Sequence, residues 1–269
     1  MDVRVGILGA GGRMGRTLVQ LVAESKDLAL GAATVEPGSP WVGRDAGELA
    51  GAGQAGVAVV DDPMAAAQAA DVLVDFTLPA ALPGNLAAVE ATTTPIVIGT
   101  TGLDGDDVAR LDAVAARVPL VQAANYSSGV TLMRHLARVA AGALGDDYDI
   151  EIVEAHHRHK QDAPSGTARA LGESVAAGRG VALEDRAVYA RHGITGARPR
   201  GEIGFQTLRG GDIVGEHTVL FAGEGERLEL THRASSRAVF ARGALRAAHW
   251  VKDQPPGRYD MEDVLGLRG

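Results

Sequence analysis

The sequence predicts an α/β protein of two domains, of which the first is built on a parallel sheet. Two observations carry this prediction. From the N-terminus to about residue 123, short apolar strand patterns alternate with helical patterns, an order typical of β-α-β crossovers. Beyond that point, segments of alternating apolar and polar residues are separated by glycine turns, which indicates further strands of α+β type. A chain of 269 residues is long enough for both domains.

The composition excludes several classes of protein. The formal net charge of -8 argues against general nucleic-acid binding. Because the chain has no cysteine, it has no disulfides, thiolate zinc site or cysteine nucleophile, and we expect it in the reducing cytoplasm. The N-terminus lacks the pattern of a signal peptide. No apolar run approaches the roughly 18 residues of a transmembrane helix, so we expect no membrane association.

The first element is an apolar strand at Val3–Leu8, followed by a glycine turn and a helical pattern carried by Leu18, Val19 and Val22. The same alternation continues to residue 123. Further strands are expected at Leu28–Ala33, Val57–Val60, Val72–Phe76, Ile96–Ile98 and Pro119–Ala123, and helices at Pro63–Ala70, Ala80–Glu90 and Asp104–Ala116.

The glycine turn is typical of a Rossmann-type site for the pyrophosphate of a dinucleotide. Met14 occupies the third glycine position of G-x-G-x-x-G, and the spacing that holds is Gly9, Gly12 and Gly15. Ligands of such sheets bind beyond the carboxyl ends of the strands. The candidate cofactor residues at these ends are Gly9, Ala10, Gly11, Gly12, Arg13, Met14, Gly99, Thr100, Thr101, Ala123, Ala124, Asn125 and Tyr126. Glu36 is either a ribose contact or a solvated loop carboxylate.

The second half begins with a helix at Val130–Leu144 that Ser128 would cap. The segment Tyr148–Glu154 alternates strictly and is expected to be a strand with one buried face. Antiparallel strands are expected at Ala187–Ala190, Gly201–Leu208, Ile213–Ala222 and Glu226–His232, with hairpin turns at 210–212 and 223–225 and a last helix at Ala238–Val251 capped by 235–237. An apolar face left open by this sheet would need a cover, for which a second copy of the chain is one candidate.

One stretch of the second half is strongly basic: His156 to Lys160 are five consecutive residues that can carry positive charge, at the end of a predicted strand. Ser165 then caps the next helix, and Gly166 and Thr167 place free N–H groups in its first turn. Cationic side chains and a helix N-terminus together suit a carboxylate. A metal site is the alternative for the histidines, with Glu154 and Asp162 as the only plausible further ligands. Arg158 and Lys160 oppose a cation, so we expect no metal.

Five ordered motifs extend this interpretation: GAGGRMGR near the N-terminus, GTTG at 99–102, EAHHRHKxDAPSGTA at 154–168, GDIVGEH at 211–217 and ASSR at 234–237. Together they resemble the 4-hydroxy-tetrahydrodipicolinate reductase family, enzymes of lysine and diaminopimelate biosynthesis formerly called dihydrodipicolinate reductases. The resemblance covers essentially the whole chain. It implies NAD(P)H-dependent reduction of a cyclic imine dicarboxylate.

The resemblance also implies an organisation and a set of roles. It implies a dinucleotide-binding domain (1–127), a substrate-binding domain whose mixed open sheet assembles a homotetramer (128–237), and a C-terminal segment that returns to the first domain (238–269). His156 would be the proton donor and Lys160 the second catalytic residue. His157, Gly166 and Thr167 would bind substrate carboxylates, with Arg237 as a further contact.

The chain departs from the family at the cofactor. The family commonly has an acidic residue followed by Arg after the second strand, where this chain has Val35 and Glu36. Leu78 stands where some members have another Arg. Because a carboxylate would repel a 2′-phosphate, the hypothesis is a preference for NADH over NADPH. Two alternatives remain at this point, a non-catalytic NAD(P)-binding regulator and another dehydrogenase of amino-acid metabolism.

Overall fold

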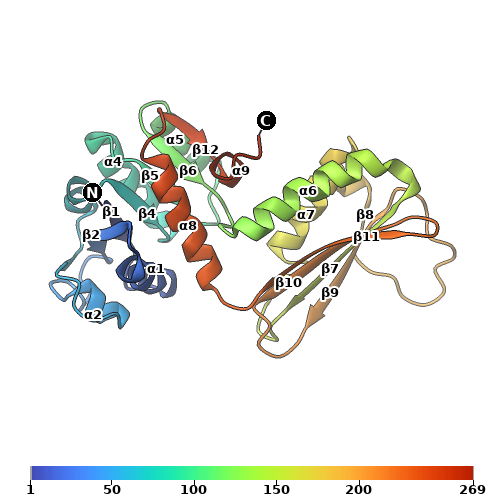
Figure 1. Ribbon diagram of the computed structural model, residues 1–269, viewed down its shortest axis with the longest axis horizontal. Coiled ribbons are helices and arrows are strands. Elements are labelled where there is room, and N and C mark those ends of the chain that lie inside the picture. The colour runs from blue at the N-terminus through green and yellow to red at the C-terminus, as the bar shows by residue number, and fades with distance from the viewer. Residues whose placement is uncertain (1, 269) are drawn as a thin grey trace. The chain divides into compact units, whose positions relative to one another are not determined.

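A computed structural model describes residues 2–268 of the chain. The chain divides into two compact units, each drawn in Figure 1. Unit 1 comprises Met1–Ser127 and Ala238–Gly269, and unit 2 comprises Ser128–Arg237. Across residues 2–268, no helix combines the length and the apolar character that a membrane crossing requires.

Unit 1 is built on a seven-stranded sheet in the order β12-β6-β5-β4-β1-β2-β3, and every pairing in it is parallel. The strands are β1 (Val3–Leu8), β2 (Leu28–Thr34), β3 (Val59–Val60), β4 (Val72–Asp75), β5 (Ile96–Ile98), β6 (Pro119–Gln122) and β12 (Gly257–Tyr259). The chain runs outward from β1 to β3 and then returns to β4 on the other side of β1. The strand order therefore reverses between β1 and β4, which is where ligands of such sheets bind.

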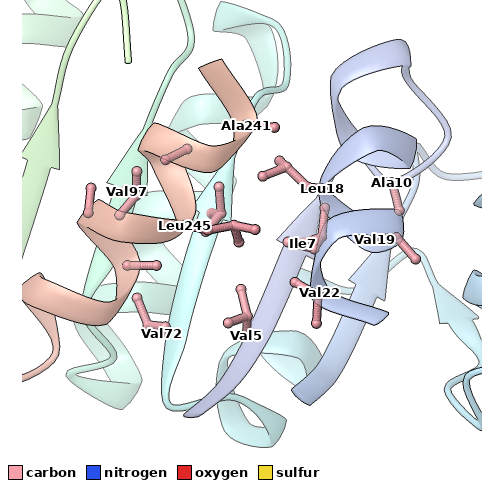
Figure 2. Close-up of a cluster of buried hydrophobic side chains, with 14 of the residues drawn as sticks. Val5, Ile7, Ala10, Leu18, Val19, Val22, Val72, Val97, Ala241 and Leu245 are labelled. Carbon is pink, nitrogen blue, oxygen red and sulfur yellow. The ribbon is translucent and has the colours of Figure 1, made fainter. Parts of the chain in front are cut away.

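Helices cover both faces of this sheet because its strands are apolar on both sides. One face packs α1 (Arg13–Glu24) and α8 (Ala238–Val251) against β1 and β4, with Ile7, Leu18 and Leu245 in the shared core (Figure 2). The other face packs α3 (Pro63–Ala69), α4 (Leu82–Thr92) and α5 (Gly105–Ala115). The short helices α2 (Ala46–Ala50) and α9 (Met261–Val264) and a 3-10 turn at Pro79–Ala81 complete the unit.

Unit 2 is a five-stranded mixed sheet in the order β11-β10-β7-β9-β8, with two helices on one face (Figure 1). Its strands are β7 (Asp149–His156), β8 (Ala187–Val188), β9 (Ile203–Arg209), β10 (Gly215–Ala222) and β11 (Arg227–Ala234), its helices are α6 (Ser128–Leu144) and α7 (Gly166–Gly178), and 3-10 turns lie at Gly145–Asp147 and Leu183–Asp185. The inward side chains Ile150, Ile152, Val219 and Phe221 pack against α6 and α7. The two sheets confirm the predicted α/β fold class.

Three details of the sequence prediction were wrong. The strands β8 and β9 run parallel to β7, whereas β10 pairs antiparallel with both β7 and β11, as expected. Residues 210–212 form no hairpin, because β7 lies between β9 and β10. Alternation specifies which face a side chain occupies but carries no information on strand direction. Helix α6 begins at Ser128 itself, so Ser128 lies inside the helix that it was expected to cap.

Candidate active site

The glycine turn of unit 1 joins the end of β1 to the start of α1. Gly9 has a φ of +80°, a conformation that favours glycine. A Cβ on Gly15 would lie 2.2 Å from the carbonyl oxygen of Gly9, so only glycine allows α1 to begin this close to the strand. Gly12 is the N-cap of α1, so no side chain caps the first N–H groups of this helix. The spacing Gly9, Gly12, Gly15 therefore forms a cradle of backbone N–H groups at a helix N-terminus, which suits a pyrophosphate.

The other cofactor candidates follow β5 and β6 at the same edge of the sheet. A Cβ on Gly99 would lie 2.2 Å from the ring of Phe76, so the backbone there is held close to the end of β4. The side chain of Thr100 is buried, with its hydroxyl 3.4 Å from Asp75. Tyr126 is buried as well, and its hydroxyl lies 2.8 Å from the carbonyl oxygen of Ile98. Burial raises the pKa of Tyr126. Thr100 and Tyr126 thus present backbone rather than side chain to a ligand.

The segment after β2 contains Glu36, which the sequence analysis named, and Trp41, which it did not name. Glu36 is exposed, and the carbonyl oxygen of Thr34 accepts from the N–H of Ala10 at 2.7 Å, which joins β2 to the glycine turn. Nearby, the guanidinium groups of Arg16 and Arg44 lie 5.5 and 5.1 Å from the ring centroid of Trp41. Arg44 lies in the same turn as Trp41, and its N–H donates to the carbonyl oxygen of Trp41 at 3.1 Å, whereas Arg16 comes from α1.

The polar cluster at the end of β4 was also missed. Asp75 is fully buried and accepts from Thr77 Oγ1 at 2.6 Å and from Asn85 Nδ2 at 2.9 Å. The Cγ2 atom of Thr77 lies 3.0 Å from the position of a Cβ on Gly9. The cluster therefore fixes the turn after β4 against the glycine cradle, at the point where the strand order reverses. The one available signal was the Asp-Phe-Thr sequence that follows a buried strand.

In unit 2, the basic stretch begins inside β7 rather than after it, because β7 extends to His156. His156 is buried, its Nδ1 lies 2.5 Å from Oε2 of Glu154, and its ring is edge-on to that of His217 at 5.1 Å between centroids. Burial holds the pKa of His156 below its ordinary value, although the hydrogen bond and the charge of Glu154 act in the opposite direction. The sequence suggested Glu154 only as a possible metal ligand. Its spacing of two residues from His156 on a strand was the signal that the two share a face.

Glu154 is the centre of a buried polar network. It is 1% exposed and accepts two parallel hydrogen bonds from Arg209 of β9, each 2.8 Å long. It also accepts the backbone N–H of Ser165 at 3.0 Å. Although burial raises the pKa of Glu154, these hydrogen bonds hold it below its ordinary value, so the carboxylate is ionised at neutral pH. The ring of His217 lies 3.2 Å from the hydroxyl of Ser165, and burial lowers the pKa of His217 to about 4.

The N-terminus of α7 lies directly after this network. Ser165 is its N-cap, with its hydroxyl accepting from the N–H of Ala168 at 3.1 Å. Gly166 is exposed and Thr167 is half-buried. Nζ of Lys160 lies 2.8 Å from Oδ1 of Asp162. Hydrogen bonding to Lys160 lowers the pKa of Asp162, and the backbone N–H of Gly166 acts in the same direction.

The remaining candidates of unit 2 are more exposed. His157 is half-buried, with its Nδ1 buried and without a partner, and its ring is 6.2 Å from that of His159. Arg237 is exposed and lies between β11 and α8, at the end of unit 2. Within residues 2–268, no three side chains of histidine, aspartate or glutamate are placed to hold a metal ion.

A dinucleotide cradle on a parallel sheet, together with a histidine–carboxylate pair beside a helix N-terminus, defines the class of NAD(P)H-dependent oxidoreductases that act on anionic substrates. Residues 3–126 match the family described as "Dihydrodipicolinate reductase, N-terminus", and residues 129–265 match "Dihydrodipicolinate reductase, C-terminus". The chain belongs to the dihydrodipicolinate reductase family, which confirms the resemblance found in the sequence.

Individual relatives agree with this assignment. The chain is 61% identical to the 4-hydroxy-tetrahydrodipicolinate reductase of Alkalilimnicola ehrlichii, over 99% of this chain and 100% of the relative. It is 59% identical to that of Thiobacillus denitrificans over the full length of both chains. Among solved structures, the dipicolinate-bound dihydrodipicolinate reductase from Paenisporosarcina sp. TG-14 has the same fold, with a TM-score of 0.78 at 24% identity, and covers 98% of this chain and 99% of its own.

Proposed function

We propose that the protein uses NAD(P)H to reduce 4-hydroxy-tetrahydrodipicolinate, a cyclic imine dicarboxylate, to tetrahydrodipicolinate in lysine and diaminopimelate biosynthesis. The observation that carries this proposal is the placement, within unit 2, of a histidine–carboxylate pair next to a helix N-terminus and a lysine. A dicarboxylate needs cationic and N–H partners, and a ring that takes up a hydride also needs a proton. Unit 2 offers both.

His156 acts as the proton donor in this proposal. Its Nδ1 is held by Glu154, which leaves Nε2 as the nitrogen that can give a proton to the substrate ring. Lys160 is the second catalytic residue, since it lies on the loop directly after β7 and its side chain is partly exposed. The dinucleotide supplies a hydride when it is bound. General acid catalysis by such a histidine contributes about 10²–10⁴ in rate.

The substrate carboxylates are held, in this proposal, by His157 and by the first turn of α7 at Gly166 and Thr167, with Arg237 as a further contact. The pairing of Asp162 supports it. Lys160 and the N–H of Gly166 both lower the pKa of that side chain, so a carboxylate of the chain itself is stabilised by the proposed catalytic lysine and by the proposed carboxylate-binding turn.

The cofactor is assigned to unit 1. Several glycines there have no room for a Cβ, and such positions let the protein backbone approach a dinucleotide closely. We assign the pyrophosphate to the residues 9–14, and the remainder of the dinucleotide to the backbone at 99–101 and 123–126. The domain roles follow: residues 1–127 bind the dinucleotide, residues 128–237 bind the substrate and associate with other copies, and residues 238–269 complete the first domain.

We further propose that Glu36 gives NADH an advantage over NADPH. Its exposed carboxylate follows β2 beside the glycine turn, where it would accept ribose hydroxyls and repel a 2′-phosphate. The opposing charges are those of Arg16 and Arg44, which both lie near the ring of Trp41. Dissociation constants and kcat/KM for both dinucleotides test the proposal in the wild type, Glu36→Arg and Arg44→Ala. Glu36→Arg should improve NADPH binding selectively, and a tenfold higher kcat/KM with NADPH in the wild type would overturn the proposal.

Association into a homotetramer through the second face of the unit 2 sheet is also proposed. Helices α6 and α7 pack on the inner face, and the outer face presents half-buried Val153, Thr218 and Leu220 and exposed Leu208. Sedimentation should show particles of four 27.7 kDa chains. Val153→Asp at the centre of this face should dissociate them, and a monomeric wild type would contradict the proposal. We place the enzyme in the cytoplasm.

The activity itself is tested by the oxidation of NADH and NADPH, followed by absorbance, with substrate generated in place from pyruvate and aspartate semialdehyde by its synthase. We expect oxidation that depends on the synthase product with at least one dinucleotide. If neither dinucleotide is oxidised although dinucleotide binding is measurable, the assigned activity is wrong.

A further inference from the structure

The buried carboxylate of Glu154 touches both halves of the proposed substrate site. Its Oε2 lies 2.5 Å from Nδ1 of His156, the proposed proton donor. Its Oε1 accepts, at 3.0 Å, the N–H of Ser165, the residue immediately before the carboxylate-binding turn. One side chain therefore restrains two residues, His156 and Ser165, that lie nine residues apart along the chain.

The burial of Glu154 requires an explanation, since a lone buried carboxylate costs several kcal/mol. Arg209 neutralises it with two parallel hydrogen bonds of 2.8 Å, and the hydroxyl of Thr207 lies 3.4 Å away. The ion pair with Arg209 would be complete without the histidine. The additional 2.5 Å contact with His156 is therefore a separate feature, and its geometry follows from the strand, because residues 154 and 156 share one face of β7.

The contact with His156 has a chemical consequence for the ring. A carboxylate at Nδ1 favours the proton on that nitrogen, so the neutral ring carries Nδ1–H and leaves Nε2 to exchange a proton with a ligand. Gly215 of the neighbouring β10 leaves room on this side, since a Cβ there would lie 3.0 Å from Nε2. The carboxylate also stabilises the protonated ring by its charge.

The hydrogen bond between Glu154 and Ser165 acts on the carboxylate-binding turn at residues 166–167. The hydroxyl of Ser165 caps α7 and lies 3.2 Å from Nε2 of His217, while its N–H is held by Glu154. The backbone at Ser165 is thus fixed from two sides. Gly166 and Thr167 follow at once, so the direction of their N–H groups depends on this anchor.

We propose that Glu154, held in place by Arg209, is a positioning residue that orients the proton donor His156 and the carboxylate-binding turn as one unit. This inference rests on the proposed function, because it takes the roles of His156 and of residues 166–167 from there. Glu154 itself is 1% exposed, so it acts through these neighbours and not by direct contact with a ligand.

Glu154→Gln tests the proposal because it keeps the shape and removes the charge. The kcat/KM for the dicarboxylate should fall at least about tenfold, a cost typical of a lost partner that orients a histidine, with both a lower kcat and a higher KM. The Kd for NADH, which unit 1 binds, should not change. The matched control is Glu173→Gln, which removes a carboxylate from the exposed surface of α7. The side chain of Glu173 is 51% exposed and pairs with Arg169 one turn earlier in the helix.

The pH profile separates positioning from a merely structural role. The groups around His156 are Glu154 on β7, Arg209 on β9, His217 on β10 and Lys160 on the loop, and only Glu154 raises the pKa of His156. A proton donor must be protonated, so activity declines above its pKa. In Glu154→Gln this alkaline limb should move to lower pH, whereas a variant that is only less stable would keep the wild-type limb.

A measurement on the wild-type enzyme tests the proposal even if Glu154→Gln does not fold. The ¹⁵N shifts of labelled histidine side chains, assigned with His156→Gln, report the tautomer of the neutral ring without any substrate. We expect Nδ1–H for His156, and an Nε2–H tautomer would overturn the proposal, as would wild-type kinetics of Glu154→Gln. Absence of substrate-dependent oxidation by the wild type would instead refute the proposed function and leave the tautomer result standing.

Discussion

The ammonium group of Lys160 is paired with a neighbour on its own loop, since its Nζ lies 2.8 Å from Oδ1 of Asp162. Asp162 is 58% exposed at the side chain, and ion pairs this exposed contribute about 0–1 kcal/mol. A substrate carboxylate can therefore displace Asp162 at small cost. In the proposed function, Asp162 is an internal competitor for the cationic site.

Asp162→Asn should lower the KM for the dicarboxylate by up to about fivefold, which corresponds to the roughly 1 kcal/mol of an exposed ion pair. The kcat should remain close to that of the wild type. Steady-state kinetics provide the measurement, with Asp185→Asn as a control that removes an exposed carboxylate elsewhere in unit 2. A large fall in kcat would show that Asp162 positions Lys160 for catalysis and does not compete with the substrate.

Replacement of the proton donor should separate chemistry from cofactor binding. His156→Gln should reduce kcat by about 10²–10⁴, the usual contribution of a general acid. The Kd for NADH should be unchanged, and the fluorescence of Trp41 beside the glycine turn can report it. His192→Gln, a change at an exposed loop histidine, serves as the control. A kcat within twofold of the wild type would assign the proton to another group.

Local signals in the sequence were sufficient for much of the fold. The glycine spacing after β1, the strand patterns of unit 1 and the turn at 223–225 each depend on residues close together in the chain, and the structure contains all of them. The direction of β8 and β9 was not predictable in this way, because alternation does not distinguish parallel from antiparallel neighbours. The short elements α2, β12 and α9 span only three to five residues, too few for a periodic pattern.

The candidate site shows the same difference between signals within one stretch of sequence and contacts that form only in the fold. The basic stretch and the cap of α7 were visible because they lie within one continuous motif. Arg209 and His217 were not recognised as site residues, since they reach Glu154 and Ser165 only through the pairing of β9 and β10 with β7. Trp41 was missed for a similar reason, because Arg16 of α1 meets its ring only in the folded unit.

The close approach of α1 to β1 predicts opposite effects for two glycine substitutions. Gly15→Ala places a Cβ 2.2 Å from the backbone oxygen of Gly9, so the helix must move. It should destabilise unit 1 by about 1–3 kcal/mol and weaken NADH binding. Gly84→Ala, in α4 with open space around it, should stabilise the unit by about 1 kcal/mol. Thermal unfolding followed by tryptophan fluorescence reports both, because Trp41 and Trp250 lie in unit 1; equal behaviour of the two variants would contradict the cradle geometry.

His217 should make the stability of unit 2 depend on pH. Burial lowers its pKa from 6.5 in the unfolded chain to about 4 in the folded one. Between these values the unfolded chain binds more protons, so stability is complete above about pH 6.5 and is lost as the pH falls toward 4, by about 3 kcal/mol in all.

This loss should be absent from His217→Gln, so the difference in unfolding free energy between the wild type and this variant should change by about that amount between pH 6.5 and pH 4. Unfolding in urea should be followed by circular dichroism at several pH values, because neither tryptophan lies in unit 2. The low pKa of Glu154 gives a loss in the same direction at lower pH, but both proteins share it. His192→Gln, at an exposed position, should retain the wild-type slope. If His217→Gln kept the wild-type dependence of unfolding free energy on pH, the prediction would be wrong, because His217 would then have the same pKa in the folded and the unfolded chain.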